Sequence, residues 1–156
     1  SHKKSPEMVL QIASLLSSDY RIHWAGAFQD PRYEVYLKHM AKAMGLEGTV
    51  KFHGHVADMN EFWKGKNYLL QTSVHEGHSL AITEAMARNI RPVIHNYYGA
   101  DRQYPDEMLF NTASEAALMI EAAHWHGFPR DYVRNSGWTL QDQAARIHEV
   151  ILGVKR

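Results

Sequence analysis

At 156 residues, the chain is long enough for one ordinary domain with its own core. Hydrophobic residues make up 45% of it and charged residues 22%, a balance that excludes a disordered chain. Basic and acidic residues number 17 each, so the chain has no global charge that would recruit nucleic acid or an anionic membrane.

The first part of the chain reads as helices alternating with strands. Ser5-Pro6-Glu7 has the pattern of a helix start, with serine as the N-cap and proline at the first helical position. Glycines at positions 26, 45 and 54 close the elements before them. The predicted elements are a strand over 20–25, a helix over 31–44, a strand over 49–53, a helix over 58–64 capped by Asp58, and a strand over 67–71.

The second part opens with a helix over 79–88 and a strand over 92–95. After Pro105 the signals weaken to an edge strand over 108–110 and helices over 114–124 and 140–152. Strands and helices that alternate at these spacings predict βαβ units and a mostly parallel sheet. We therefore expect one Rossmann-like, three-layer α/β/α domain over residues 1–156. Its ligand should lie beyond the carboxyl ends of the strands, at the loops near Gly26, over 54–56 and over 72–79.

Two carboxylates flank the helix predicted over 79–88. Glu76 precedes the helix and Glu84 lies within it, at most ~12 Å apart along the axis at 1.5 Å per residue. Between them, the backbone amides of His78, Ser79 and Leu80 form an anion site at the helix start. A sugar ring, a diphosphate and a ribose suit these three positions. From spacing alone, the alternative that both acids are ordinary solvated residues is equally open.

The residues around this helix carry a family resemblance. The pattern S-x-x-E-G-x6-E-A-M-A-x4-P-V-I, from Ser73 to Ile94, resembles the E-x7-E region of retaining GT-B glycosyltransferases, and the nearest group is GT4, glycosyltransferase group 1. Residues 4–7 resemble the family's K-G-P-E helix start, residues 50–56 its V-x-F-x-G-x-V segment, and Gly137-Trp138 its terminal S-W. The resemblance covers nearly the whole chain and implies the C-terminal, donor-binding half of a GT-B fold.

The resemblance also assigns roles to residues. It implies that Glu76 contacts the donor sugar and that Lys4 neutralises the diphosphate leaving group, which makes these two the catalytic candidates. The donor is then a UDP-, GDP- or ADP-linked sugar, and no metal or other cofactor is expected. The remaining substrate-binding candidates are His55 and Val56 at the base, Gly77, His78, Ser79 and Leu80 at the sugar and diphosphate, and Glu84 at the ribose.

Three departures from the family pattern matter. Ser5 replaces a glycine, which we expect to be tolerated because serine caps a helix well. His78 and Ser79 replace the usual phenylalanine and glycine, and this changes the loop against the sugar. The strand carrying the arginine that partners Lys4, and the whole acceptor-binding half, would precede Ser1. We therefore interpret the chain as a fragment that binds nucleotide weakly and transfers nothing alone. The alternatives are a non-catalytic nucleotide- or sugar-recognising module and a GT-B sugar-nucleotide epimerase fragment.

Cysteine and histidine content bears on metals and location. The absence of cysteine excludes disulfides and Cys-ligated zinc and fits a cytoplasmic protein. No apolar run approaches the ~20 residues of a membrane-spanning helix, so any membrane contact would come through the absent half. His75 and His78 resemble a zincin motif that is one residue short, and His53 and His55 lie two apart on a strand. We favour ordinary structural roles for these histidines.

Overall fold

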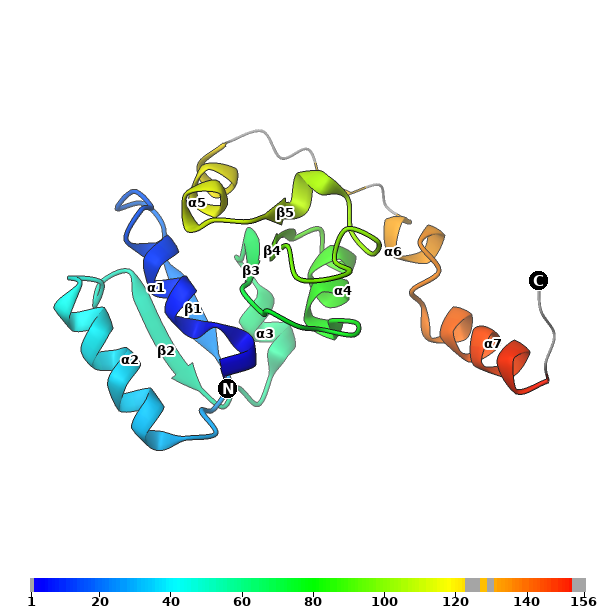
Figure 1. Cartoon of the computed structure of the whole chain (residues 1–156), viewed down its shortest axis with the longest axis horizontal. Coiled ribbons are helices and arrows are strands. Elements are labelled where there is room, and N and C mark those ends of the chain that lie inside the picture. The colour runs from blue at the N-terminus through cyan, green and yellow to red at the C-terminus, as the bar shows by residue number, and fades with distance from the viewer. Residues whose placement is uncertain (1, 123–126, 129–130, 153–156) are drawn as a thin grey trace.

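The computed structural model describes residues 2–122, 127–128 and 131–152, and Figure 1 shows their arrangement. The strands are β1 (Ile22–Ala25), β2 (Val50–Gly54), β3 (Tyr68–Gln71), β4 (Arg91–His95) and β5 (Leu109–Phe110). The helices are α1 (Pro6–Ala13), α2 (Pro31–Ala43), α3 (Met59–Trp63), α4 (Leu80–Ala87), α5 (Ala113–Glu121), α6 (Tyr132–Asn135) and α7 (Leu140–Ile151). Two short 3-10 turns, η1 (His2–Lys4) and η2 (Asp106–Met108), complete the set.

The predicted α/β architecture is confirmed, and the pairings of the described strands are all parallel. The strands form two hydrogen-bonded groups rather than one continuous sheet: β1 pairs with β2, and β4 pairs with β3 and β5. The predicted elements are present, with bounds that differ by a residue or two at most ends. The short helix α6 was not predicted, and the predicted end of the 114–124 helix at His124 lies outside the described residues.

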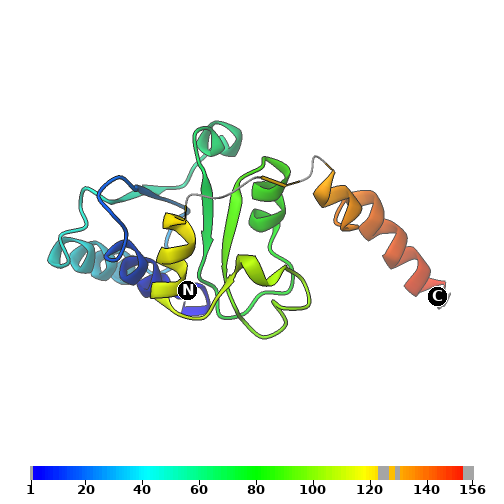
Figure 2. The same ribbon diagram turned by 90° about the horizontal axis from the view of Figure 1, so that it is seen from above.

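Helices cover both faces of the strands, and Figure 2 shows α1 and α2 on one side with α3 and α4 on the other. The alternation of β4 produces these two faces. Val93 packs in a cluster with Ile12 of α1 and with residues of α5. Ile94, the next residue, packs on the opposite side with Ile82 of α4. The core is therefore a stack of helix, strand and helix layers, as expected for this class.

The last helix, α7, projects away from the rest of the described chain (Figures 1 and 2). Its side chains at Leu140 and Val150 are 86% and 81% exposed. A capping box at Thr139 and Asp142 fixes where it begins. None of the helices in the described ranges is both long and apolar enough to cross a lipid bilayer.

The helix starts fall into two groups. Side chains of Asp30, Asp58, Thr112 and Thr139 accept backbone N–H groups at the starts of α2, α3, α5 and α7. At the starts of α1 and α4 the N-cap serine makes no such bond, and at the start of the short helix α6 neither does Asp131.

The expectation that Ser5 caps α1 through its side chain is wrong. Ser5 has φ 42° and ψ 57°, the left-handed conformation. In that conformation its hydroxyl does not accept from the first turn, and a residue with a Cβ is strained. A glycine would adopt this backbone without strain.

Candidate active site

The carboxyl ends of the parallel strands meet at one edge of the molecule, and the N-terminal segment is fastened there. Beyond β3, the hydroxyl of Thr72 donates to the carbonyl oxygen of Lys4 over 2.8 Å. The N–H of Val74 donates to the carbonyl oxygen of Lys3 over 2.9 Å. These two bonds hold residues from the start of the chain against the loop that leads into α4.

An ion pair joins the two catalytic candidates. Lys4 Nζ donates to Glu76 Oε1, although the residues are 72 positions apart in the sequence. The lysine side chain is 55% exposed and the glutamate side chain only 11%. Burial by itself raises the pKa of Glu76, but hydrogen bonds from Lys4 and Ser73 and the charges of Lys4 and Lys3 together hold it below its ordinary value. Glu76 is therefore an ionised acceptor at neutral pH.

A glutamine at the end of β3 organises the loop around Glu76. Gln71 Nε2 donates to Ser79 Oγ over 3.2 Å and lies 3.5 Å from Glu76 Oε1. The hydroxyl of Ser73, a fully buried residue, donates to Gln71 Oε1 over 3.1 Å. Sequence reasoning missed Gln71 as a site residue. The available signal was a polar side chain at the carboxyl end of a strand otherwise rich in leucine.

The start of α4 is open toward this loop. The hydroxyl of Ser79 accepts from Gln71 and makes no capping bond to the helix, and the first turn of α4 contains no acidic residue. The backbone N–H groups of Leu80 and Ala81 precede the first intrahelical donors, and Ile82 N–H already bonds to Ser79 O over 3.1 Å. Unpaired amides and the positive end of the helix dipole make this start suited to an anion.

One turn further along α4, Glu84 presents an exposed carboxylate. The indole Nε1 of Trp63, on α3, donates to Glu84 Oε2 over 3.3 Å. Arg88 donates to the carbonyl oxygen of Glu84 and to the side chain of Asn60, which ties α4 to α3. The buried tryptophan was not recognised from the sequence, and its bond fixes the direction of one carboxylate oxygen.

The loop after β4 also borders Glu76. The interpretation of residues 97–101 as a turn agrees with the bond from Ala100 N–H to Tyr97 O, 2.9 Å. Tyr97 and Tyr104 are each only 3% exposed. Burial is the main cause that raises the pKa of both phenols, and the charge of Glu76 acts in the same direction. Both side chains are therefore neutral beneath the acidic loop.

The structure brings together Lys4, Glu76 and the residues from 77 to 80, which lead into α4. Glu84 lies one turn further along α4. His55 and Val56 follow β2, at the same edge of the molecule but in the other sheet. His78 lies against Trp138, with ring centroids 5.9 Å apart, and its Nε2 is 3.0 Å from the hydroxyl of Thr83. Trp138, which belongs to the segment that resembles the family's terminal S-W, thus packs on the candidate site.

The histidines were expected to have ordinary structural roles. His53 Nε2 lies 2.9 Å from Nδ1 of His23 on the neighbouring strand, a contact between two strand side chains. Burial lowers the pKa of His23, and the nearby charge of Lys66 adds to this. Within the described ranges, no group of three or more potential metal-ligating side chains comes together.

Comparisons with known proteins place this geometry among related folds. Residues 1–110 match the family model described as glycosyl transferases group 1. Comparison with the curated proteins gave no match. Among solved structures, Anabaena Alr3699/HepE in complex with UDP-glucose is similar with a TM-score of 0.72 and 20% identity, over 96% of this chain and 41% of that one. The chain thus spans about two fifths of the HepE chain.

Two solved structures of single domains are also similar. The catalytic domain of cholesterol-alpha-glucosyltransferase from Helicobacter pylori has a TM-score of 0.64 and 18% identity, over 95% of this chain and 92% of that one. The C-terminal domain of a glycosyl transferase group 1 family protein (LpcC) from Francisella tularensis has a TM-score of 0.67 and 18% identity, over 94% and 81%. At these identities the likeness shows a shared fold.

Proposed function

The chain belongs to the glycosyl transferases group 1 family, and from that premise we propose that it is the donor-binding half of a retaining glycosyltransferase. It binds a nucleoside-diphosphate sugar at the start of α4. The acceptor is bound by an N-terminal half that lies outside residues 1–156. The observation that carries this proposal is the pairing of Lys4 with Glu76 beside an uncapped helix start.

Each part of such a donor has a counterpart in the site. The sugar hydroxyls donate to Glu76, which is ionised and held in place by Lys4 and Gln71. The diphosphate lies at the open amides of α4. The ribose hydroxyls donate to Glu84, whose orientation is set by Trp63.

The reaction breaks the bond between the anomeric carbon of the sugar and an oxygen of the diphosphate. Negative charge grows on the diphosphate as that bond breaks, and the Lys4 ammonium and the α4 amides are fixed positive groups beside it. Such preorganised groups stabilise the transition state without reorganisation at the moment of reaction. They supply the charge that a divalent cation would otherwise supply, so we propose that the reaction needs no metal. The departing diphosphate gives Lys4 a second acceptor besides Glu76.

We propose a uridine diphosphate sugar as the first donor to test. HepE, which shares the fold, was solved in complex with UDP-glucose, and GDP- and ADP-linked sugars are the alternatives. We propose that the isolated chain binds nucleotide without transferring sugar, since it spans only about two fifths of the HepE chain. We place the protein in the cytoplasm, in keeping with its lack of cysteine.

Titration calorimetry with UDP, GDP and ADP tests the donor site directly. Changing Glu84 to alanine (Glu84→Ala) should weaken binding of the preferred nucleotide by about 1–3 kcal/mol, because ribose hydroxyls lose a charged acceptor. The matched control is Glu34→Ala, which removes a half-buried helix glutamate paired with Lys38 on α2. Equal affinities for the two variants would show that Glu84 is not a ligand-binding residue.

The complete polypeptide distinguishes an enzyme from a binding module. With donor and acceptor present, an enzyme releases nucleoside diphosphate and forms a glycosidic bond. The anomeric proton of the first-formed product, observed by NMR, shows whether configuration is retained. Tight nucleotide binding without release would favour the non-catalytic module, and an inverted product would contradict the retaining mechanism.

A further inference from the structure

A segment near the end of the chain follows α4 from its end back to its start. We call its described residues, 127–128 and 131–138, the brace. Just beyond the end of α4, Asn89 Oδ1 accepts the N–H of Phe128 over 2.7 Å. Further along the brace, α6 lies beside α4 (Figure 1). At the start of α4, the indole of Trp138 meets the ring of His78. The brace therefore contacts both ends of the helix that carries the proposed donor site.

Trp138 is surrounded by aromatic rings. Its ring centroid lies 5.8 Å from that of Tyr104, 6.1 Å from that of Tyr132 and 5.9 Å from that of His78. The ring planes meet at 68°, 75° and 63° in the same order, the edge-to-face geometry that aromatic pairs prefer at such distances. The indole also packs against the core cluster that contains Ile82 of α4. The core thus fixes the position of Trp138.

His78 is the exposed residue that Trp138 contacts at the site. Its Nε2 lies 3.0 Å from Thr83 Oγ1, and this oxygen lies 3.5 Å from the carbonyl oxygen of Ser79. His78 directly precedes Ser79, the N-cap of α4. An exposed side chain usually keeps its rotamer freedom, because holding it costs entropy. Here a hydrogen bond and an aromatic contact hold the ring against α4, and with it the backbone that leads into the helix.

The phenol of Tyr104 lies beside the same backbone. Burial and the neighbouring Tyr97 raise the pKa of Tyr104, and the backbone of Ser79 acts in the opposite direction. Both hydroxyls are buried, and in the described ranges neither makes a hydrogen bond of full geometry. Buried hydroxyls are usually bonded, so these exceptions require an explanation. Tyr104 places a polar group next to the backbone of Ser79 without committing that backbone to a fixed bond.

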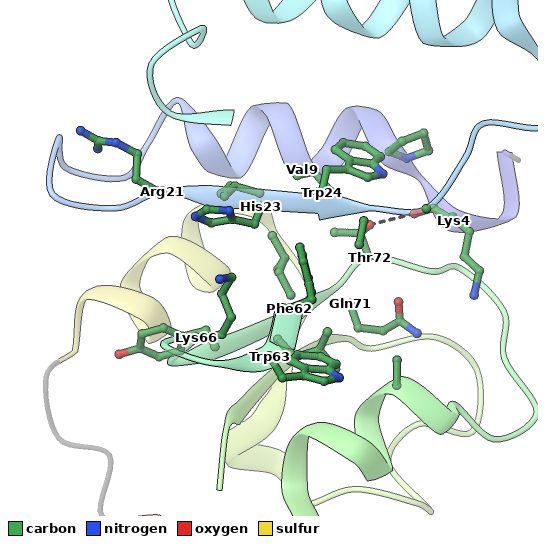
Figure 3. A pocket seen from close by; sticks show the side chains of 18 of the residues that line it. Lys4, Val9, Arg21, His23, Trp24, Phe62, Trp63, Lys66, Gln71 and Thr72 are labelled. Carbon is green, nitrogen blue, oxygen red and sulfur yellow. Dashed lines mark hydrogen bonds between the residues drawn. The ribbon is translucent and has the colours of Figure 1, made fainter. Parts of the chain in front are cut away.

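A second set of contacts holds the loop before α4 from β3 and from the N-terminal segment. Figure 3 shows Gln71 and Lys4 with the amide of one and the ammonium of the other directed toward the same region. Gln71 Nε2 donates to Ser79 Oγ over 3.2 Å, and Lys4 donates to Glu76. These bonds fix two side chains of the loop. The brace supplies what they do not, namely contacts to the ring of His78 and to the backbone of Ser79.

We infer that Trp138 is a positioning residue for the donor diphosphate, which acts with Tyr104 to fix the backbone of His78 and Ser79 and thereby the unpaired amides at the start of α4. The inference rests on the proposed function, which makes the diphosphate the ligand of these amides. Donors that are already in place bind an anion more tightly, because no ordering entropy is lost on binding. Trp138 acts through the loop rather than on the reacting atoms.

A comparison of UDP with UMP separates positioning at the diphosphate from a general loss of structure. Trp138→Ala should weaken UDP binding about tenfold, because the loop must then be ordered as the ligand binds. UMP has one phosphate fewer, so its affinity should fall by less than about threefold. NMR titration of the 156-residue chain measures both affinities.

A conservative variant and a matched control accompany this measurement. Trp138→Phe keeps an aromatic ring at the same position and should hold UDP affinity within about threefold of that of the unaltered chain. Tyr20→Ala is the control, because it removes a half-buried ring at the amino ends of the strands. That ring meets Tyr68 edge-on with centroids 6.5 Å apart. Both nucleotide affinities should be unchanged in the control.

Backbone order parameters from NMR relaxation test the brace without any nucleotide. In Trp138→Ala, the amides of Gly77, His78 and Ser79 should fall from about 0.85, the value of a rigid backbone, to below about 0.6. Trp138→Phe should keep the rigid value. Because no ligand is present, this result does not depend on the proposed function.

Unchanged order parameters in Trp138→Ala would overturn the inference, and so would equal losses of UDP and UMP affinity. If the unaltered chain binds neither nucleotide, the proposed function fails, and the order parameters still decide whether Trp138 holds the loop. Should Trp138→Ala fail to fold, Trp138→Leu takes its place. Leucine keeps an apolar side chain against the core cluster but has no ring, so the same losses are expected.

Discussion

The starts of α2 and α4 show two different uses of a helix terminus. At α2, the Asp30 carboxylate accepts from Arg32 N–H over 2.9 Å, and Glu34 adds a negative charge in the first turn. At α4, the Ser79 hydroxyl is engaged by Gln71 and the first turn has no acid. The protein thus satisfies the positive helix end where it has only a structural role and leaves it open where a ligand is expected.

The start of α1 resembles that of α4 in lacking a side-chain cap, and it too lies beside the Lys4–Glu76 pair. The two helices of eight residues with uncapped starts therefore meet at one site. The starts of α3, α5 and α7 each have a side-chain cap, as the start of α2 does. Among the described helices of eight or more residues, only the two at the candidate site lack a side-chain cap; the four-residue helix α6 lacks one as well. The following variants test that distinction, from the largest expected effect to the smallest.

Removal of the Lys4 ammonium beside the uncapped start of α4 should have the largest effect. In a polypeptide that contains both halves of the proposed enzyme, Lys4→Met should lower kcat by about 10²-fold, since one fixed positive group no longer stabilises the departing diphosphate. The measurement is the rate of nucleoside diphosphate release at saturating donor and acceptor. Lys38→Met on α2 is the control and should leave kcat unchanged. A kcat equal to that of the control would remove Lys4 from the catalytic machinery.

Removal of the Asp30 cap at the start of α2 should affect stability alone. Asp30→Ala should lower the free energy of unfolding by about 1 kcal/mol, the usual cost of losing an N-cap. Denaturant unfolding monitored by circular dichroism measures the loss. Nucleotide affinity, measured by calorimetry on the same preparation, should not change. If the affinity fell with the stability, the contrast between capped and open ends would not separate structure from function.

The ion pair at the open end predicts a dependence of stability on pH. The folded-state pKa of Glu76 is lowered, so its contribution is present above the unfolded-state pKa and is lost as the pH falls through the folded-state value. Glu76→Gln should therefore be less stable than the unaltered chain at about pH 7, and the gap should close toward about pH 3. Unfolding free energies at several pH values measure the gap. A gap independent of pH would assign the effect to packing.

The smallest effect is expected at the start of α1. Ser5→Gly should raise the free energy of unfolding by up to about 1 kcal/mol, because glycine adopts the left-handed backbone without a Cβ clash. Gly45, which already has φ 71° after α2, shows the same conformation occupied by the favoured residue. Thermal unfolding of the two chains measures the gain. A loss of stability would mean that the serine hydroxyl contributes more than its backbone strain costs.

Local signals in the sequence predicted the regular part of the fold well. The cap at Asp58 and the stop at Gly45 act within a few residues, so the start of α3 and the end of α2 follow from short windows of sequence. The contact of Lys4 with Glu76 joins residues 72 apart, and the family resemblance implied only that both residues serve the same donor site. No local pattern in the sequence predicts that contact.

The parts that escaped prediction depend on tertiary structure. The bond from Trp63 to Glu84 joins two helices, and the network of Gln71 joins a strand end to a helix start. The left-handed backbone of Ser5 contradicts its propensity as a cap, because the path from η1 into α1 sets its dihedral angles. The division of the strands into two groups depends on which strands pair with each other, and no short window of sequence specifies that pairing.

The Lys4–Glu76 pair has a further consequence for selectivity. The charge of Lys4 is balanced by that of Glu76, so this pair adds little net attraction for a bare anion such as inorganic phosphate beyond that of the α4 amides. A molecule that offers hydroxyl donors to the carboxylate and an anionic group to the ammonium satisfies both partners at once. Lys4 and Glu76 thus neutralise each other, and only a molecule with both kinds of group can separate them without leaving one charge uncompensated.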